Sequence, residues 1–377
     1  MHLSTVKISR AALAHNLAQF RRLAPGALLA PVVKANAYGH GLVPVAQILE
    51  REGADQLCVN ALYELAALRA AKVRLPVYVL GWVPPQQMDL AAQLDASIVV
   101  FDGETVKAAS EAATTHGTAM GLHIKLETGN NRQGVALPEA LELAQLIHDL
   151  PGVTFEGLSS HYADIEDTTD HQFAKGQLTR FNEAHDTLVK AGHRPRLRNF
   201  SNSAATILWS ETQFEMVRVG ISMYGMWPSK ETCVSAVMLH REKPELRPVL
   251  EWTTRIAQVK EVATGEYVGY GRSYRATHPT RLAILPVGYY DGYARHLSNL
   301  AHVLVNGAIA PVRGRVCMNI IMVDVTDVPN AGVGDEVVLL GQSGDCRVTA
   351  EELAQWGGTI NYEVTTRIND TLPRVVV

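Results

Sequence analysis

The first half of the chain alternates short apolar runs with longer amphipathic stretches. Between residues 28 and 225, runs rich in β-branched residues are separated by segments whose apolar positions recur every three or four residues. This pattern is typical of repeated strand–helix units that build a parallel sheet. The predicted strands are LLAPVVK from Leu28, DQLCVN from Asp55, LPVYVLG from Leu75, ASIVVF from Ala96, GLHIKLE from Gly121, VTFEGLSSH from Val153, RLRNFS from Arg196 and FEMVRVG from Phe214.

The segments between these strands have helical periodicity. In LVPVAQILEREG the apolar residues from Leu42 to Leu49 fall on one helical face, and Gly53 supplies a stop. Before the first strand, SRAALAHNLAQF offers Ser9 as an N-cap ahead of another apolar face. Eight strand–helix units predict a closed (β/α)8 barrel. An open doubly wound sheet is the alternative, but neither a G-x-G-x-x-G after the first strand nor a P-loop is present.

The pattern changes after residue 245. Short strands punctuated by glycines replace the helical periodicity, as in TRLAILPVGYY and GDEVVLLG. The charged stretch LHREKPELRPV, with Pro244 and Pro248, reads as a connection. We therefore predict a (β/α)8 barrel over residues 1–243 and a mostly-β domain over residues 244–377.

Composition narrows the function classes. A chain of 377 residues with 47% hydrophobic and 19% charged residues is typical of a globular protein of two domains. A net charge of −4 without a basic stripe disfavours nucleic acid, so small molecules or a second copy are the expected partners. No signal peptide or membrane span is evident, which predicts a cytoplasmic protein. The four cysteines lie far apart without metal-ligand spacing, so we expect neither a disulfide framework nor a structural zinc site.

Lys34 is the first candidate for chemistry, because it ends an apolar run in VVKANAYGHG. A buried amine is costly unless it is paired, reaches solvent or is held neutral for catalysis. Polar residues also follow four later strands. In a (β/α)8 barrel the carboxyl ends of the strands share one rim, so these residues predict one active site. They are Lys125, Arg132, His161, Ser203, Arg218 and Gly220.

The ends of the last two strands suggest a phosphate site. Ser203 begins the helix after SN, and RVGISMYG offers the backbone N–H groups of Gly220 and Ile221. A phosphate site beside a lysine points to pyridoxal phosphate, whose aldehyde forms a Schiff base with a lysine amine. Lys34 is the candidate for that amine.

The ordered motifs of the chain resemble those of alanine racemases over nearly its whole length. These motifs are VVKANAYGHG, HIKLETGNNRQG, GLSSHYA, FSNSAA, VRVGISMYG, VGYGRSY, VGYYDGYAR, GRVCMN and NYEVTTRI. The resemblance implies a pyridoxal-phosphate enzyme that interconverts L-alanine and D-alanine and supplies D-alanine for peptidoglycan. It also implies a homodimer in which the β domain of one subunit completes the active site of the other.

The resemblance also assigns roles to residues. Lys34 resembles the cofactor lysine and the base that serves the D-isomer, and Tyr270 resembles the opposing base for the L-isomer. Arg218 resembles the arginine that donates a hydrogen bond to the pyridine nitrogen of the cofactor. Lys125 resembles a lysine that is often carbamylated in the family and would then orient Arg132. The positions that match phosphate-binding residues are Tyr38, Ser203, Gly220, Ile221 and Tyr362. Arg132 and the backbone of the partner's Met318 match the positions that bind the substrate carboxylate.

Two further roles follow from the chemistry that this resemblance implies. Racemisation removes a proton from one face of a carbon and returns one to the other face, so two bases must flank the cofactor. A phenol needs help to act as a base at neutral pH. We expect His161, hydrogen-bonded to Arg218, to help Tyr270, and Tyr289 to line the substrate entrance with Tyr362.

Departures from the common family pattern concern the substrate. Glu127, Asn130 and Asn319 stand where Asp, Met and Asp are usual. A racemase that accepts serine or larger amino acids is therefore an open alternative. A pyridoxal-phosphate decarboxylase with a similar barrel would be expected to carry a glycine triplet, which this chain lacks. A cofactor carrier would resemble the barrel alone.

Overall fold

In the computed structural model, which describes residues 3–377, all eight strands predicted between residues 28 and 225 are present and run parallel. Each is shorter than its apolar run. Their bounds are β2 (Leu28–Leu29), β3 (Leu57–Val59), β4 (Val77–Val79), β5 (Ala96–Val100), β6 (Met120–Lys125), β7 (Val153–Ser159), β8 (Leu197–Asn199) and β9 (Met216–Val217).

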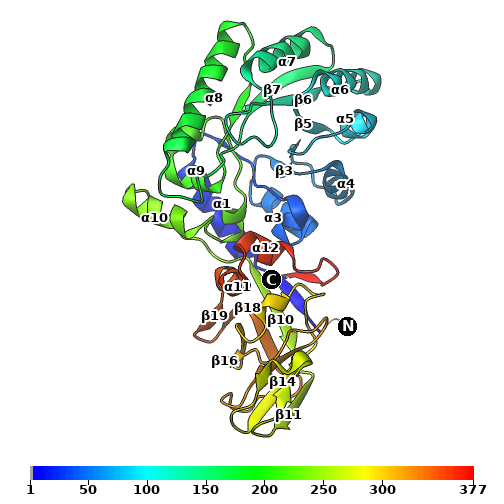
Figure 1. Ribbon diagram of the computed structural model, residues 1–377. Helices are drawn as coiled ribbons and strands as arrows, with labels where there is room; N and C mark the ends of the chain where they lie inside the picture. The colour runs from blue at the N-terminus through cyan, green and yellow to red at the C-terminus, as the bar shows by residue number, and fades with distance from the viewer. Residues whose placement is uncertain (1–2) are drawn as a thin grey trace. The chain divides into compact units, whose positions relative to one another are not determined.

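Helices flank the strands of this half of the chain in Figure 1, and the strands form a six-stranded sheet and a two-stranded sheet. Strands β3 to β8 pair in sequence order, and β2 pairs with β9. A parallel bridge between Val32 and Cys58 joins the β2 segment to β3. On the other side, the Arg218 N–H donates to the Ser201 carbonyl over 3.1 Å, just beyond β8 and β9. The predicted (β/α)8 barrel is therefore confirmed.

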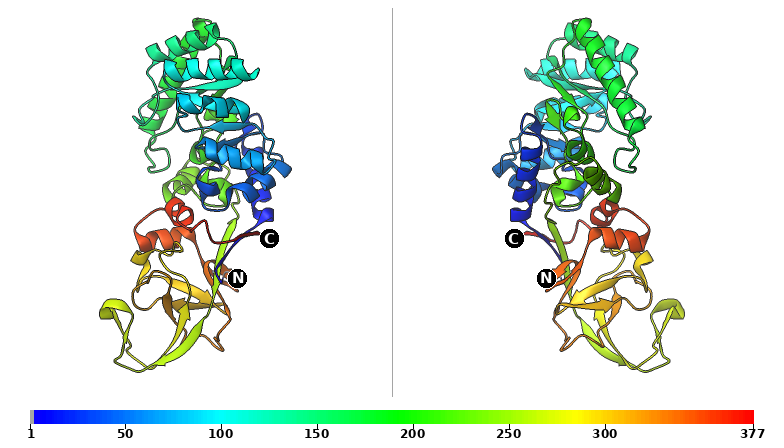
Figure 2. Two further views of the ribbon diagram at one scale, coloured as in Figure 1. Left: turned by 90° about the vertical axis from the view of Figure 1, so that its right-hand side faces the viewer. Right: turned by 90° about the vertical axis from the view of Figure 1, so that its left-hand side faces the viewer.

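Helices surround the barrel strands on the outside (Figures 1 and 2). Because helices cover its outer face, β3 and β4 are buried at every position, which explains why barrel strands read as continuous apolar runs. No helix within residues 3–377 is long and apolar enough to span a bilayer. The helices are α1 (Arg10–Leu23), α3 (Leu42–Arg51), α4 (Leu62–Ala70), α5 (Met88–Gln93), α6 (Gly103–His116), α7 (Leu137–Asp149), α8 (Gln172–Lys190), α9 (Ser203–Leu208) and α10 (Lys230–Met238). The segment labelled α2 (Lys34–Tyr38) is a short left-handed turn.

The second half of the chain is mostly strand, as expected. One sheet has the order β16-β15-β18-β10-β1-β20 with β19 on β18, a second has the order β11-β14-β17, and β12 and β13 form a hairpin. The bounds are β1 (Thr5–Ile8), β10 (Leu250–Arg255), β11 (Gln258–Val262), β12 (Tyr267–Val268), β13 (Tyr274–Arg275), β14 (Thr280–Leu285), β15 (His302–Val305), β16 (Ala308–Pro311), β17 (Ile321–Asp324), β18 (Glu336–Ser343), β19 (Cys346–Val348), β20 (Arg374–Val376), α11 (Ala350–Gly357) and α12 (Asn361–Thr366).

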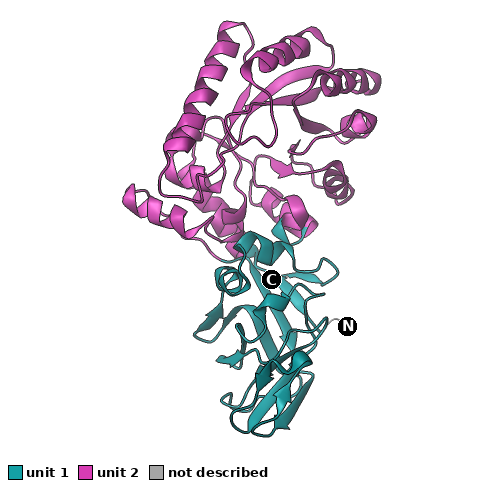
Figure 3. Cartoon of the chain, in the orientation of Figure 1, with its two compact units in different colours: residues 1–10, 38–41, 248–377 teal, residues 11–37, 42–247 magenta. Residues whose placement is uncertain are grey.

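The chain divides into two units (Figure 3). The barrel unit comprises Ala11–Ala37 and Leu42–Arg247, and the β unit comprises Met1–Arg10, Tyr38–Gly41 and Pro248–Val377. Strand β1 lies in the β unit because it pairs with β10 and β20. These strands are far apart in sequence, and local periodicity does not reveal such a pairing. The domain bounds predicted from the sequence therefore placed residues 5–8 with the barrel.

Candidate active site

Lys34 begins a left-handed turn of helix. Four consecutive residues, Ala35 to Tyr38, have φ between 52° and 54°, and none of them is glycine. Left-handed backbone costs an L-residue roughly 1–2 kcal/mol. The turn is closed by a 2.8 Å hydrogen bond from the Ala37 N–H to the Val33 carbonyl. Backbone strain of this kind clusters at functional sites, where the surrounding structure holds it in place.

Glu64 on α4 fixes this turn, and the sequence analysis missed it. The buried Glu64 carboxylate accepts hydrogen bonds from the backbone N–H groups of Ala35, over 2.7 Å, and Asn60, over 2.7 Å. It also accepts one from Ala61 over 3.1 Å. A glutamate near the start of a predicted helix reads as an ordinary helix-end residue, so only the tertiary contact identifies its role.

Four basic side chains, Lys34, Lys125, Arg132 and Arg218, act on one another at the barrel mouth. Burial lowers the pKa of Lys34, and Arg132 and Arg218 lower it further. Burial also lowers the pKa of Lys125 well below its usual value, with added repulsion from Arg218, Arg132 and Lys34. Of the causes, Glu64 opposes the shift at Lys34 and Glu127 opposes it at Lys125. A cluster of this composition is suited to anionic ligands such as a phosphate and a carboxylate.

Arg218 is held by Asn199 and Ser160. Its Nη1 donates to both the backbone carbonyl, over 2.6 Å, and the side-chain Oδ1 of Asn199, and its Nη2 donates to the Ser160 carbonyl over 2.9 Å. We expected a hydrogen bond between Arg218 and His161, and it is not among the contacts of the described residues. The N–H donors of a guanidinium lie in one plane. Here Nη1 and Nη2 donate to two backbone carbonyls and one amide oxygen. Burial lowers the pKa of His161 well below its usual value, and the charges of Lys125 and Arg218 lower it further.

Polar residues near β6 and β7 line one small recess. It is bounded by Lys125, Glu127, Asn130, Arg132 and His161, together with Leu126, Gln133 and Ser160. The Glu127 carboxylate accepts hydrogen bonds from backbone N–H groups of residues 129–132, including one of 2.5 Å from Gly129. Although burial opposes it, these donors keep the pKa of Glu127 below its usual range. Glu127 therefore shapes the loop that carries Arg132.

Ser203 and Gly220 lie together, as the phosphate prediction requires. The Ser203 hydroxyl accepts hydrogen bonds from the backbone N–H groups of Gly220, over 3.0 Å, and Ser222, over 3.4 Å. The buried Ser222 hydroxyl has no partner among the described residues, and Ile221 is buried between the two. Ser203 is the first residue of α9, and the side chain of Asn202 caps that helix. The Ser203 hydroxyl proton and the unpaired Ser222 hydroxyl are left as donors among the described residues, and such hydroxyl groups fit a phosphate oxygen.

Tyr38 and Tyr362 meet within the β unit. Their ring centroids lie 6.1 Å apart. Gly39 explains the approach: its φ is +85°, and a Cβ there would lie 1.9 Å from the Thr365 carbonyl oxygen of α12. Arg374 then donates to the Gly39 carbonyl over 3.0 Å and 3.1 Å. Gly39 thus allows the Tyr38–Gly41 segment to pack against the helix that carries Tyr362.

Tyr270, Tyr289 and Met318 gather elsewhere in the β unit, and all three are exposed, at 71%, 42% and 55%. The Tyr289 N–H donates to the Cys317 carbonyl over 3.0 Å, beside Met318. A Cβ on Gly271, next to Tyr270, would lie 2.9 Å from the Arg315 guanidinium. These contacts tie the Tyr270 turn and Tyr289 to one loop, residues 313–319.

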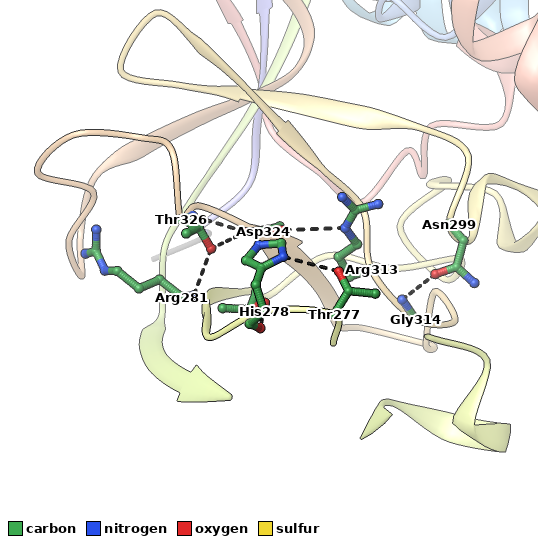
Figure 4. Close-up of polar contacts among 9 residues, drawn as sticks. Thr277, His278, Arg281, Asn299, Arg313, Gly314, Asp324 and Thr326 are labelled. Atoms are coloured by element: carbon green, nitrogen blue, oxygen red, sulfur yellow. Dashed lines mark hydrogen bonds and ion pairs between the residues drawn. The ribbon is translucent and has the colours of Figure 1, made fainter. Parts of the chain in front are cut away.

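That loop is itself anchored by a polar network (Figure 4). Asn299 accepts a 2.6 Å hydrogen bond from the Gly314 N–H, and Asp324 forms an ion pair of 3.6 Å with Arg313. Asp324 also accepts from the Thr326 hydroxyl over 2.6 Å. The network holds the start of the Met318 loop on β17.

Comparisons with known proteins agree with these motifs. Residues 8–228 match the family model described as alanine racemase, N-terminal domain, and residues 249–376 match that described as alanine racemase, C-terminal domain. An alanine racemase of Desulfovibrio desulfuricans is 40% identical over 98% of this chain and 97% of its own length. The structure of an alanine racemase from Clostridium difficile 630 is similar at a TM-score of 0.92, with 32% identity over 100% of this chain and 96% of that one. A Bacillus anthracis alanine racemase with bound L-Ala-P has a TM-score of 0.91 and 32% identity, over 100% of this chain and 95% of that one.

Proposed function

The chain belongs to the alanine racemase family, and from that premise we propose that its own residues interconvert L-alanine and D-alanine with pyridoxal phosphate as cofactor. The observation that carries the proposal is that Lys34, an amine whose pKa burial lowers, lies close enough to Arg218 for the charge of the guanidinium to lower that pKa further. The reaction would supply D-alanine for peptidoglycan, and a cytoplasmic location stays part of the proposal.

The residues of the barrel mouth suit this cofactor. Ser203, Gly220 and Ile221 would hold the phosphate, and the unpaired Ser222 hydroxyl is an additional candidate donor. By the family motifs, Tyr38 and Tyr362 of the β unit, whose rings lie 6.1 Å apart, would add their phenols. Arg218 would face the ring nitrogen. Pyridoxal phosphate, when bound, supplies an aldehyde for the amines and a ring that withdraws electrons from the substrate α-carbon. An arginine at the ring nitrogen keeps that atom unprotonated, because two cations in contact repel. This favours proton exchange over decarboxylation or transamination.

Two bases complete the chemistry. The lowered pKa of Lys34 leaves more of its amine free at neutral pH, so Nζ can take or return a proton on one face of the substrate carbon. Tyr270 would serve the other face through its phenol oxygen. We assign Tyr270 to the partner subunit, because it lies exposed in the β unit with Met318 and Tyr289. Large exposed apolar and aromatic side chains that gather on one unit are typical of a surface that another chain covers.

Arg132 would bind the substrate carboxylate, with the backbone of the partner's Met318. Lys125 lines the same recess as Arg132, and its lowered pKa favours the neutral amine. A neutral amine can attack CO2, which forms an N–C bond, releases one proton and leaves a carbamate anion. That anion would orient Arg132 and offset the cation cluster. The ¹³C spectrum of protein equilibrated with ¹³C-bicarbonate tests this, because Lys125→Met should remove a carbamate signal that the wild type shows.

Mixing inactive subunits tests the shared site. Lys34→Ala and Tyr270→Phe should each be inactive as homodimers. A mixed dimer holds one site with both changes and one intact site, so an equal mixture that exchanges subunits should recover about a quarter of wild-type activity. No recovery, with exchange demonstrated by tagged subunits, would place both bases in one subunit and reject this arrangement.

Exchange in deuterated water tests the reaction and its breadth. Purified protein with pyridoxal phosphate should incorporate deuterium at the α-carbon of L-alanine and yield D-alanine, whereas Lys34→Ala should not. Serine and larger amino acids belong in the same panel, because Asn130 and Glu127 line the recess with Arg132. Faster exchange on serine than on alanine would favour the broader racemase, and release of CO2 would favour a decarboxylase.

A further inference from the structure

A buried polar network lies behind Arg218. Asn199, at the end of β8, has its Oδ1 against Nη1 of Arg218 and its Nδ2 3.2 Å from Nδ1 of His123 on β6. The same Nδ2 is 3.5 Å from the Leu158 carbonyl. His123 and Asn199 are both fully buried. One amide therefore connects an arginine to a histidine inside the barrel.

The donors and acceptors of this network determine its orientation. A guanidinium has only donors, so the amide atom that faces Arg218 must be the oxygen. The NH2 group of Asn199 then points toward His123 and Leu158, where a carbonyl oxygen can accept only from a donor. Nδ1 of His123 must in turn be an acceptor. The imidazole is therefore neutral, with its proton on Nε2.

The opposite tautomer would break the network. A proton on Nδ1 would face the NH2 group of Asn199, and rotating the amide to relieve that clash would turn NH2 toward Arg218. Nε2 has no hydrogen-bond partner among the described residues, so the present tautomer leaves one donor unpaired. It is still the better arrangement, because the alternative places two donors against each other beside a buried cation.

Packing holds the His123 ring in this position. Its ring lies 4.0 Å from that of Tyr78 at an angle of 22°, so the two stack. Gly157 on β7 lies against the ring, because a Cβ at this position would be 2.1 Å from Nδ1 of His123. Burial, together with the charges of Arg218, Arg196 and Lys125, lowers the pKa of His123 to about 3. The ring thus lacks both the space to turn and the environment to gain a second proton.

We propose that His123 is a positioning residue for Arg218, acting through Asn199: its neutral imidazole keeps the Asn199 amide in the orientation that presents Oδ1 to the guanidinium. The proposal rests on the proposed function of Arg218 at the pyridine nitrogen. His123 itself does not touch the reacting atoms. Through Asn199, His123 fixes the orientation and position of the Arg218 guanidinium. The guanidinium in turn sets the electronic environment of the cofactor ring.

Nitrogen NMR of the wild-type chain without cofactor tests the tautomer directly. Long-range ¹H–¹⁵N correlation of ¹⁵N-histidine protein should show a His123 ring with its proton on Nε2 that does not titrate between pH 8 and pH 5. His123→Gln identifies the signal by its loss. In Asn199→Asp the carboxylate can only accept, so the proton should move to Nδ1. A wild-type proton on Nδ1, or no tautomer change in Asn199→Asp, would overturn the proposal.

Two His123 variants test the effect on Arg218. His123→Phe keeps a ring to stack on Tyr78 but lacks an acceptor, whereas the side-chain carbonyl of His123→Gln can accept from Asn199. We expect His123→Phe to weaken pyridoxal-phosphate binding about tenfold and to shift the absorption of the bound cofactor, and His123→Gln to stay within about threefold of wild type. Equal effects in both variants, or none in His123→Phe, would overturn the proposal.

These two experiments separate the inference from the proposed function. If the wild-type chain failed to bind pyridoxal phosphate, the proposed function would be wrong, while the NMR result would still decide the orientation of Asn199. If the cofactor bound normally but His123→Phe left its affinity and absorption unchanged, only the positioning role would be wrong.

Discussion

The carboxylate of Glu64 accepts a 2.7 Å hydrogen bond from the backbone N–H of Ala35, the residue that directly follows Lys34. Its other oxygen accepts from Asn60 and Ala61, at the start of α4. One buried side chain therefore connects two parts of the barrel. These are the turn that follows Lys34 and the neighbouring strand–helix unit. Burial lowers the pKa of the Lys34 amine and Arg132 lowers it further, whereas the charge of Glu64 opposes this shift.

Glu64→Gln should lower the free energy of unfolding and lower the pKa of Lys34. An amide has one acceptor oxygen instead of two, so at least one buried backbone N–H loses its partner, at about 1–3 kcal/mol of unfolding free energy. Loss of the negative charge should also lower the pKa of Lys34 further. Urea unfolding measures the first effect, and the pH dependence of borohydride trapping of pyridoxal phosphate on Lys34 measures the second.

Glu50→Gln is the matched control for Glu64→Gln. Glu50 also accepts two backbone hydrogen bonds, from Arg74 over 2.6 Å and Leu75 over 3.1 Å, but it is not among the charges that act on Lys34. Both bonds go to Oε1, so the amide oxygen of glutamine can keep them. Glu50→Gln should therefore change stability little and leave the pH dependence of trapping unchanged. An equal pH shift in both variants would contradict the role assigned to Glu64.

Ala35→Gly should stabilise the chain, unlike most alanine-to-glycine changes. Ala35 is exposed and has φ of 54°, where the Cβ is strained and glycine is not. We expect a gain of about 0.5–1 kcal/mol in the free energy of unfolding. Ala67→Gly, at an exposed position within the right-handed helix α4, should instead lose about 1 kcal/mol. Losses of equal size would show that the left-handed turn stores no strain.

Lys125→Met should change how stability depends on pH. The pKa of Lys125 is lowered in the folded chain, so the unfolded chain binds its proton more tightly. Wild-type stability should therefore rise with pH between the lowered pKa and about 10.4, at up to about 1.4 kcal/mol per pH unit. Below this window the wild type carries the full penalty.

The difference between the two proteins measures this effect. Without CO2, Lys125→Met should be more stable than wild type at pH 7, and the difference should shrink as the pH approaches 10. Paired urea titrations at several pH values give the difference, in which other titrating groups cancel. A difference that is independent of pH would contradict the lowered pKa of Lys125.

Gly288→Ala should separate Tyr289 from the Met318 loop. A Cβ at Gly288 would lie 2.2 Å from the Cys317 carbonyl oxygen and 2.4 Å from that of Met318, so the backbone must move. We expect a loss of about 1–3 kcal/mol and reduced affinity for alanine. Gly332→Ala is the control, because its nearest neighbour would be the Asn330 oxygen at 3.8 Å. Normal stability and alanine affinity in Gly288→Ala would contradict the close packing.

Strand-end reasoning found most of the barrel residues that meet in the structure. Lys125, His161 and Arg132 line one recess, and Ser203 contacts Gly220. It found them because the carboxyl ends of parallel strands in a closed barrel lie on one rim, so sequence order alone brings them near each other. The roles of these residues came from the family motifs and stay predictions.

The same reasoning missed the residues that support the site. Glu64, Asn199 and His123 carry no local signature, because each acts through a contact with a strand or turn that is distant in sequence. The expected link from His161 to Arg218 was wrong for the same reason. The hydrogen-bond partners of a buried arginine depend on which backbone carbonyls lie next to it in the fold. The spacing of apolar residues along the sequence does not reveal those carbonyls.

The sequence by itself determined the strand–helix repeat, the change to short strands and the family, because burial imposes a period on apolar residues and the motifs are long and ordered. The tertiary structure alone decided that Lys34 begins a left-handed turn, that β1 joins the last strands of the chain, and that Asn199 holds Arg218. Those features depend on hydrogen bonds between segments far apart in sequence, and no local pattern of residues encodes such a pairing.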